Sequence, residues 1–306
     1  MLKKRRLGTS DLEVSELSLG CMSLGTDKGQ AESIIKTAIE EGINFFDTAD
    51  LYDFGENEKI IGSVLQPFRD KVILATKVGN RWNEGEDGWQ WDPSKTYIKE
   101  AVKNSLKRLN TDYIDLYQLH GGTIEDRIDE TIEAFEELKA EGFIRYYGIS
   151  SIRPNVIREY VQKSNMVSVM MQYSLLDRRP EEEALPLLHQ NGISVITRGS
   201  LAKGLLSDRM LEKTSPSIGE KGYLDYSFSE VSALVEKLKV AFHRPLNEIA
   251  LHYNLANPAV ASVVVGASSV QQLKQNVQAI KSNELTTDEI NQLRSLTKST
   301  IYQDHR

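Results

Sequence analysis

Short apolar runs alternate with longer amphipathic segments along almost the whole chain. The run SELSLG at 15–20 comes before AESIIKTAIEEG at 31–42, and the alternation continues to ASVVVGA at 261–267. Runs that are apolar on both faces are typical of parallel strands that helices cover. The eight strand-like runs are 15–20, 44–49, 72–77, 113–120, 146–150, 167–172, 193–198 and 261–267.

A segment with helical periodicity follows each run. In 95–109 the apolar residues recur at i, i+4, i+8 and i+11, which places them on one helical face. That face carries Ile98, Val102, Leu106 and Leu109. Several segments end at a glycine that suits a left-handed C-cap, namely Gly42, Gly142 and Gly192. The helix-like units are 31–42, 56–66, 95–109, 127–142, 155–164, 181–192, the pair 228–242 and 245–257, and 270–280.

Eight β/α repeats in a chain of 306 residues predict a closed (β/α)8 TIM barrel. No stretch rich in Pro, Ser and Gly separates the repeats, so we expect a single domain over 1–306. An open, doubly wound sheet is the alternative. It predicts a G-x-G-x-x-G fingerprint after the first strand, and GCMSLG at 20–25 lacks that spacing.

Charge and composition narrow the function classes. The formal net charge of -7 argues against a general nucleic-acid binder, which usually has a basic excess. The single cysteine, Cys21, cannot form an intrachain disulfide, and no Cys/His cluster of metal-binding type occurs. No apolar run has the length of a signal peptide core or of a membrane span. We therefore expect a soluble, cytoplasmic protein that binds neither nucleic acid nor membrane and holds no metal.

Polar side chains gather where the predicted strands end. In a barrel of this kind the chemistry lies at the C-terminal ends of the strands. Six of the eight strand-end residues can ionise or form side-chain hydrogen bonds, and unpaired buried charges are costly. One such residue is explained by strand termination or an ion pair, whereas the whole set favours a site. The strand-end residues are Gly20, Asp47, Lys77, His120, Ser150, Gln172, Arg198 and Gly266.

Several motifs, in this order, resemble the aldo-keto reductase superfamily, closest to its bacterial branch and similar to potassium-channel β subunits. They are RRLGTSDLEVSELSLGCMSLG, FDTADLYDFGENE, ATKVG, DLYQLH, YYGISS, QYSLLDR and VVVGASSVQQLKQN. Together they span nearly the whole chain. The resemblance implies a catalytic tetrad of Asp47, Tyr52, Lys77 and His120, a nicotinamide cofactor and a small-molecule carbonyl substrate.

The chemistry of these four side chains suits carbonyl reduction, which needs a hydride on carbon and a proton on oxygen. A phenol such as Tyr52 can give the proton, although an ordinary phenol has a pKa of about 10. A neighbouring ammonium, Lys77, stabilises phenolate, and Asp47 neutralises and positions that lysine. His120 completes an oxyanion-type site for the carbonyl oxygen. Asp50 and Asp53 have no role here, and we expect solvated loop carboxylates.

The last strand leads through Gly266 and small hydroxyl residues into a helix, and the free N–H groups at the start of a helix can bind phosphate. Ser268 or Ser269 can cap that helix, although most such caps bind nothing. The resemblance places the adenosine half of the dinucleotide at Ser268, Gln272, Gln275 and Asn276. It implies carboxamide contacts from Ser150 and Gln172, with Gly20, Cys21 and Met22 along the ribose. The loop that crosses the pyrophosphate contains Gly199, Leu201, Lys203, Gly204 and Leu205. Arg198 and Gly266 also belong to the cofactor-binding residues that the resemblance implies.

Two positions depart from the family pattern. Gln272 stands where the family often has an Arg for the 2′-phosphate, and Gln cannot supply that charge. We expect NADPH, the cofactor usual in the family, with NADH possible. Arg198 stands where the family stacks an aromatic residue on the nicotinamide. A guanidinium plane can stack on a ring, and its charge disfavours the cationic oxidised form.

All three tryptophans lie in one long loop after the third strand, at Trp82, Trp89 and Trp91. Long loops at the functional face of a barrel often form a lid or a pocket wall, although such a loop can also pack its own tryptophans. From 81 to 92 the loop holds one Arg and four acidic residues, which disfavours anionic substrates. We therefore expect neutral aldehydes to be preferred.

The function indicated is an NADPH-dependent oxidoreductase that reduces aldehydes and ketones to alcohols. Two alternatives stay open. Lys77 at a strand end is also suited to a Schiff base with a carbonyl, as in a lyase. A weakly catalytic, cofactor-sensing subunit is the other, since a fold does not fix a function. The sequence indicates no particular oligomeric state.

Overall fold

Eight parallel strands close into a barrel, which confirms the (β/α)8 fold class and excludes the open sheet. The computed structural model describes all residues except 1, 84, 86–87, 208–209 and 211–214. Each strand pairs with the next barrel strand, and the last pairs with the first. The barrel strands are β3 (Leu17–Gly20), β4 (Phe45–Asp47), β5 (Ile73–Val78), β8 (Ile114–Leu119), β9 (Ile144–Ser150), β10 (Ser168–Gln172), β11 (Ser194–Arg198) and β12 (Val260–Gly266).

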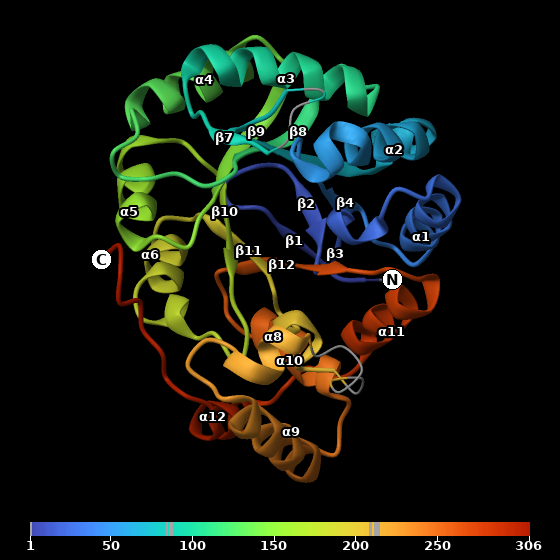
Figure 1. Cartoon of the computed structure of the whole chain (residues 1–306), viewed down its shortest axis with the longest axis vertical. Helices are drawn as coiled ribbons and strands as arrows, with labels where there is room; N and C mark the ends of the chain where they lie inside the picture. Colours follow the sequence, from blue (N-terminus) through green and yellow to red (C-terminus); the bar gives the residue numbers. More distant parts are fainter. Residues whose placement is uncertain (1, 84, 86–87, 208–209, 211–214) are drawn as a thin grey trace.

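Helices surround these strands, with α3 and α4 along the upper side of Figure 1 and α5 and α6 to the left. The predicted apolar face of α3 is buried, and the three predicted C-cap glycines have positive φ. The α-helices are α1 (Lys28–Glu40), α2 (Glu56–Leu65), α3 (Lys95–Leu109), α4 (Ile128–Ala140), α5 (Pro154–Lys163), α6 (Ala184–Gln190), α8 (Pro216–Lys221), α9 (Phe228–Phe242), α10 (Leu246–Leu255), α11 (Val270–Lys281) and α12 (Thr287–Leu296). Short 3-10 helices are η1 (Cys21–Leu24), η2 (Tyr52–Gly55), η3 (Gln66–Lys71), η4 (Arg179–Glu181) and η5 (Ala202–Gly204).

The protein has two apolar cores because every barrel strand has two buried faces. The larger core lies between the strands and the helices. The smaller one fills the barrel and includes Phe45, Leu116 and Ile196. Because alternate residues of each strand lie in the two cores, consecutive residues of a strand are apolar. The strands therefore appear in the sequence as continuous apolar runs.

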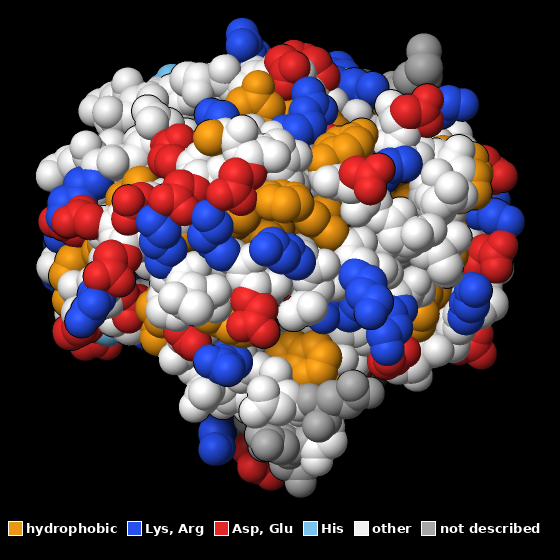
Figure 2. Space-filling model, turned by 90° about the horizontal axis from the view of Figure 1, so that it is seen from above, with side chains coloured by type: hydrophobic (Ala, Val, Ile, Leu, Met, Phe, Trp, Pro, Cys, Tyr) orange, Lys and Arg blue, Asp and Glu red, His pale blue; other side chains and the backbone are white. Residues whose placement is uncertain are grey.

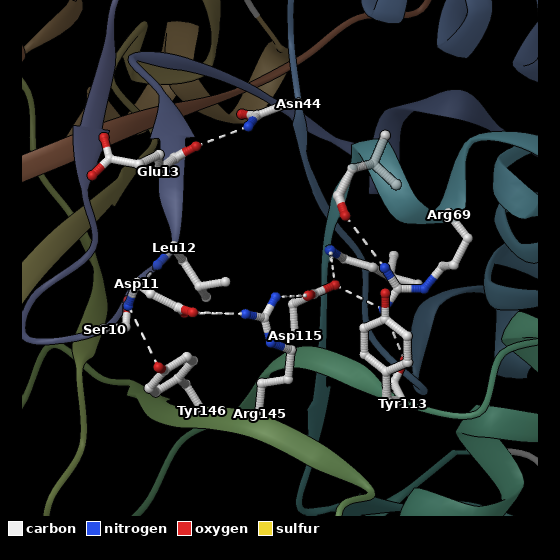
Figure 3. A network of polar contacts seen from close by, with 12 residues as sticks. Ser10, Asp11, Leu12, Glu13, Asn44, Arg69, Tyr113, Asp115, Arg145 and Tyr146 are labelled. Carbon is white, nitrogen blue, oxygen red and sulfur yellow. Dashed lines mark hydrogen bonds and ion pairs between the residues drawn. The ribbon is translucent and has the colours of Figure 1, made fainter.

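An antiparallel hairpin of β1 (Lys4–Arg6) and β2 (Glu13–Ser15) closes the N-terminal end of the barrel. Its Leu7, Leu12 and Val14 belong to the inner core. Arg145 of β9 ties the hairpin down by donating two hydrogen bonds to the carboxylate of Asp11 (Figure 3). The opposite end of the barrel, which holds the C-terminal ends of the strands, is open.

The outer surface carries both signs of charge close together. Figure 2 looks onto the side of α3 and α4 and shows basic and acidic side chains next to one another. Lys95 and Lys99 of α3 both form ion pairs with Glu137 of α4. Among the described residues, no helix is both long enough and apolar enough to cross a membrane.

Several short elements have no counterpart in the sequence-based expectation. They are the β1–β2 hairpin, a second hairpin of β6 (Asn80–Arg81) and β7 (Gln90–Trp91), and the helices α8 and α12. Two- and three-residue strands are too short to show a period. The helix α12 is marked by a capping box at Thr286 and Glu289, a local signal that could have revealed it.

Candidate active site

A cavity of about 1200 Å³ opens at the C-terminal ends of the barrel strands. All eight predicted strand-end residues line it, so the ring expected from the sequence is present as a single surface. Other predicted site residues also line it. These are Met22, Tyr52, Trp89, Trp91, Gly199, Leu201, Lys203, Gly204 and Gln272.

Three predicted catalytic side chains meet at the floor of this cavity. The ammonium of Lys77 donates a hydrogen bond of 2.7 Å to the Asp47 carboxylate and one of 2.7 Å to the Thr48 carbonyl. A third contact, of 3.3 Å, joins Lys77 Nζ to the hydroxyl of Tyr52. Lys77 and Asp47 are buried, with exposed fractions of 1% and 4%, so bulk water screens this cluster little.

The charge of Lys77 is kept by its partners. Burial by itself lowers the pKa of Lys77, but the Asp47 carboxylate and then the Tyr52 oxygen outweigh burial and raise it above the ordinary value. The lysine is therefore a fixed cation beside the phenol. An ammonium has three donors, and each one has an acceptor here.

His120 follows β8 and stands beside Tyr52, with the two rings edge to face at 5.9 Å between centroids. Burial, and then the charges of Lys77 and Arg198, lower the pKa of His120 to about 3. Its imidazole is therefore neutral at physiological pH. Among the described residues its Nδ1 has no hydrogen-bond partner. A neutral imidazole has one donor and one acceptor, which suits it to orient a polar ligand.

The turn after β4 brings Tyr52 back over Lys77. The Asp50 backbone N–H bonds the Lys77 carbonyl, and the Tyr52 N–H bonds the Ala49 carbonyl. Buried Asn57 accepts from Thr48 Oγ1 at 2.7 Å and donates to the Cys21 carbonyl at 2.9 Å. The loop that bears the phenol is thus tied to two strand ends, which limits its motion.

The expectation that Asp50 is solvated is wrong. Its side chain is only 1% exposed, whereas Asp53 is exposed as expected. Burial, and then the negative charge of Glu58, raise the pKa of Asp50 well above its usual range. Trp82 donates to the Asp50 carbonyl at 3.1 Å and covers this turn. Asp50 and Tyr52 lie in the same turn, and this turn places the Asp50 side chain inside the protein. The polar sequence around Asp50 does not indicate this burial.

On the other side of the cavity, Gln172 connects the exposed Arg198 to the buried Asp177 through hydrogen bonds. Arg198 donates to Gln172 Oε1 at 3.2 Å, and Gln172 Nε2 donates to Asp177 at 2.8 Å. Ser150 lies at the end of the neighbouring strand β9. These groups form a polar wall that faces the Lys77 cluster across the cavity.

The start of α11 forms the far end of the cavity. Ser269 is the N-cap, because its side chain accepts from the Gln272 N–H. The Gln272 side chain folds back and accepts from the Ser268 N–H at 3.1 Å. Asn276 is buried, and its Nδ2 has no partner among the described residues. Of these residues Gln272 lines the cavity, so its neutral amide is the side chain that this end presents.

Some predicted site residues do not line the cavity. Cys21 is buried with its Sγ on the Leu19 carbonyl, and Leu205 packs in the outer core. In both cases a small apolar side chain is more stable in the core than at a polar opening. Ser268, Gln275 and Asn276 lie on or beside α11 but not on the cavity wall.

The tryptophan loop divides into two parts. Trp89 and Trp91 line the cavity, and Trp91 packs so closely over Gly79 that a Cβ there would lie 2.6 Å from its ring. Trp82 does not line it, because its ring packs against Phe54 and the guanidinium of Arg108. The acidic residues Glu84, Glu86 and Asp87 lie outside the described residues.

Other lining residues were not expected from the sequence. They come from β6, from loops and from the C-terminal segment, and they include Asn80, Ser151, Arg153, Tyr223 and His305. Asn80, Ser151 and Arg153 follow strands closely, so the rule that found the other residues could have found them. Tyr223 and His305 lie far along the chain from any strand end, and no local pattern marks them.

Comparison with known proteins identifies relatives over the whole chain. The model of the aldo/keto reductase family matches residues 16–298. The oxidoreductase YqkF of Bacillus subtilis (strain 168) is 62% identical over 306 residues, 100% of both chains. The NADH-specific methylglyoxal reductase of Escherichia coli (strain K12) is 30% identical, covering 92% of this chain and 94% of its own. The holo form of aldo-keto reductase AKR11C1 from Bacillus halodurans is 59% identical, covers 100% of both chains and has a TM-score of 0.95.

Proposed function

The chain belongs to the aldo/keto reductase family, and we propose that it reduces aldehydes and ketones to alcohols with NADPH as the hydride donor and Tyr52 as the proton donor. One observation carries this proposal: a buried lysine cation lies 3.3 Å from a tyrosine hydroxyl at the floor of the strand-end cavity. Family membership supports a carbonyl substrate of low molecular weight. The choice of NADPH and the roles of the individual residues are part of the proposal.

The cavity suits a dinucleotide. It extends from Tyr52 to Gln272, and its volume exceeds the range of roughly 300–1,000 Å³ usual for small-molecule pockets. Lys203 lines the cavity, and its exposed cation provides a charge for a phosphate. Asn276 lies on α11 off the cavity wall, and its Nδ2 has no partner among the described residues. The proposed carboxamide contacts are Ser150 and Gln172. The ribose and pyrophosphate contacts are Gly20, Cys21, Met22, Gly199, Leu201, Lys203, Gly204, Leu205 and Gly266, and the adenosine contacts are Ser268, Gln272, Gln275 and Asn276.

When bound, a reduced nicotinamide supplies a hydride for the carbonyl carbon. Tyr52 gives its hydroxyl proton to the carbonyl oxygen, so that the product is a neutral alcohol. The phenolate left on Tyr52 is stabilised by the Lys77 ammonium, which Asp47 holds in place. Neutral His120 orients the carbonyl oxygen by a hydrogen bond. Solvent in the open cavity then returns a proton to Tyr52.

Lys77 is poorly placed for the Schiff-base alternative. Attack on a carbonyl needs a free amine lone pair, whereas the Lys77 nitrogen donates three hydrogen bonds and carries a charge. Borohydride trapping with substrate separates the two functions. We expect no covalent adduct, and a trapped adduct on Lys77 would favour the lyase.

The cofactor preference depends on Gln272. An Arg at this position would supply a charge for the 2′-phosphate, and the neutral Gln272 amide is turned back onto Ser268. The Escherichia coli relative is named for its use of NADH. We propose NADPH as the cofactor, with NADH able to replace it, and parallel titration of both measures the preference.

Arg198 is proposed to bias binding toward the reduced cofactor. Its guanidinium is exposed on the cavity wall and is held by Gln172. A cation there disfavours the positively charged oxidised ring more than the neutral reduced one. The test is titration of both redox forms into wild type and Arg198→Tyr, and an unchanged affinity ratio rejects the idea.

The experiment that tests the function is stopped-flow absorbance of the nicotinamide band across a panel of aldehydes, with NADPH and NADH in parallel. Wild type is expected to oxidise the cofactor in a single turnover. Tyr52→Phe, which loses only the hydroxyl, is expected to bind the dinucleotide and lose most of the turnover. Cofactor binding without oxidation by wild type across the panel would favour the cofactor-sensing alternative.

A further inference from the structure

A buried carboxylate stands behind the polar wall of the cavity. Asp177 lies in the loop after β10, and its side chain is fully buried. Arg179 clasps it with two hydrogen bonds, of 2.7 Å to Oδ1 and 2.8 Å to Oδ2. Gln172 Nε2 donates to the same Oδ2 at 2.8 Å. Asp177 does not line the cavity, so it can act there only through a neighbour.

The carboxylate decides which way the Gln172 amide faces. An ionised carboxylate accepts hydrogen bonds and cannot donate them, so the NH₂ group of the amide must face Asp177. The second contact of that NH₂ group, at 3.4 Å, is with the Tyr223 hydroxyl. The amide oxygen is consequently turned toward the cavity. A reversed amide would set an oxygen against the carboxylate and an NH₂ group against a cation.

That amide oxygen holds Arg198, which donates to it at 3.2 Å. The side chain of Arg198 is otherwise exposed on the cavity wall. Without this acceptor a flexible arginine has many rotamers of similar energy. The buried Asp177 carboxylate therefore restricts the orientation of the Gln172 amide, and this amide restricts the conformation of the exposed Arg198 side chain.

The surroundings protect this arrangement from water. The Tyr302 ring, in the C-terminal segment, covers the Arg179 guanidinium at 4.9 Å. Burial, and then the charge of Asp177, raise the pKa of Tyr223 to about 12, so its hydroxyl stays neutral beside Gln172. In this low-dielectric setting the carboxylate interacts strongly with each donor.

We propose that Asp177 is a positioning residue of the cofactor site: its carboxylate fixes the orientation of the Gln172 amide and, through that amide, the location of the Arg198 guanidinium. This rests on the proposed function, in which Gln172 and Arg198 contact the nicotinamide. The orientation leaves the amide oxygen facing the cavity, where it would accept from the carboxamide NH₂ of a bound nicotinamide. Asp177 contributes to cofactor affinity without touching the cofactor.

The test substitutes the carboxylate by an amide in two places. Asp177→Asn removes one acceptor from a site with three donors, so Gln172 or Arg179 loses its bond. Asp115→Asn is the matched control, because Asp115 is likewise a buried carboxylate paired with arginine, here Arg69 and Arg145, but lies at the other end of the barrel. By fluorescence titration with NADPH and with NADH, Asp177→Asn is expected to weaken binding about tenfold, and Asp115→Asn less than about twofold.

A double-mutant cycle separates positioning from a general effect on folding. In a Gln172→Ala background, Asp177→Asn should change the dinucleotide Kd by less than about twofold, because the amide through which it acts is gone. An undiminished effect in that background, or a normal Kd for Asp177→Asn alone, overturns the inference. If wild type binds neither dinucleotide, the proposed function fails and the inference fails with it.

A second variant covers the case in which Asp177→Asn does not fold. Arg179 is partly exposed, and Arg179→Lys replaces the two-bond contact to the Asp177 carboxylate with a weaker one while keeping a positive charge beside it. We expect it to weaken dinucleotide binding about threefold, with a larger rise in KM for the cofactor than fall in kcat. Binding equal to that of wild type contradicts the positioning role.

Discussion

Two buried carboxylates at opposite ends of the same barrel serve different purposes. At the closed end, Asp115 of β8 accepts from Arg69, from Arg145 and from the Leu74 backbone N–H (Figure 3). At the open end, Asp47 of β4 accepts from Lys77 and Gln118. Both side chains are buried, at 1% and 4% exposed. Burial of an ion pair is therefore not what distinguishes the site.

The difference lies in what the neighbours leave unsatisfied. Around Asp115 two arginines and a backbone donor saturate one carboxylate, and Asp11 of the hairpin loop accepts from the same Arg145. Around Asp47 the lysine reaches onward to Tyr52, and among the described residues Gln118 Oε1 and His120 Nδ1 have no partner. A saturated cluster stabilises a fold, whereas spare donors and acceptors beside a cavity can act on a ligand.

The strongest test of this contrast is Lys77→Met. Loss of the cation removes the group that stabilises the Tyr52 phenolate, so kcat/KM should fall about 10²- to 10⁴-fold. It also leaves Asp47 buried without its partner, which should cost on the order of 3 kcal/mol of stability. Steady-state kinetics and urea unfolding measure the two effects. Near-normal turnover would remove Lys77 from the chemistry.

The His120 ring should make stability depend on pH. Its folded-state pKa of about 3 lies below the ordinary histidine value of 6.5, so only the unfolded chain takes up the proton between these values. The stability that neutral His120 contributes is fully present above pH 6.5. As the pH falls below 6.5 it should decline by about 1.4 kcal/mol per pH unit.

Urea unfolding of wild type and His120→Asn at several pH values between 4 and 8 isolates this effect, because the difference between the two proteins removes the other titrating groups. The difference should shrink as the pH drops below 6.5. A difference that stays constant over that range would mean that His120 takes up its proton equally well in the folded protein.

A substitution at the closed end should lower stability without lowering activity. Asp115→Asn removes the charge between Arg69 and Arg145 and should lower the unfolding free energy by about 1–3 kcal/mol. Its kcat/KM should stay within about twofold of wild type, because nothing in the cluster touches the cavity. A tenfold loss of activity in a folded variant would show that the two ends are coupled.

The smallest expected effect concerns substrate charge. The loop 81–92 has more acidic than basic residues, but Arg153, Arg198 and Lys203 line the same cavity and offset part of that charge. Benzaldehyde should be preferred over 4-carboxybenzaldehyde by about twofold to fivefold in kcat/KM. Equal or reversed values would mean that the cavity cations dominate.

Much of the site could be predicted because the barrel converts sequence position into spatial position. Strand-end residues from 20 to 266 converge, so polar residues that end apolar runs found the cavity wall. The conformations of individual loop residues were predicted incorrectly. Asp50 turns inward with its loop, and Trp82 packs on Arg108 instead of on the cavity. Loop conformation depends on tertiary contacts, and neither periodicity nor polarity encodes these.

The central claim is that Lys77 acts through Tyr52, and a kinetic double-mutant cycle on these two residues tests it most directly. Single-turnover rates would be measured for wild type, Tyr52→Phe, Lys77→Met and the double variant at saturating cofactor. The account predicts that Lys77→Met costs about 10²-fold or more with the hydroxyl present and less than about threefold without it. Equal losses in both backgrounds would show that the lysine acts independently of the phenol, and would contradict the account.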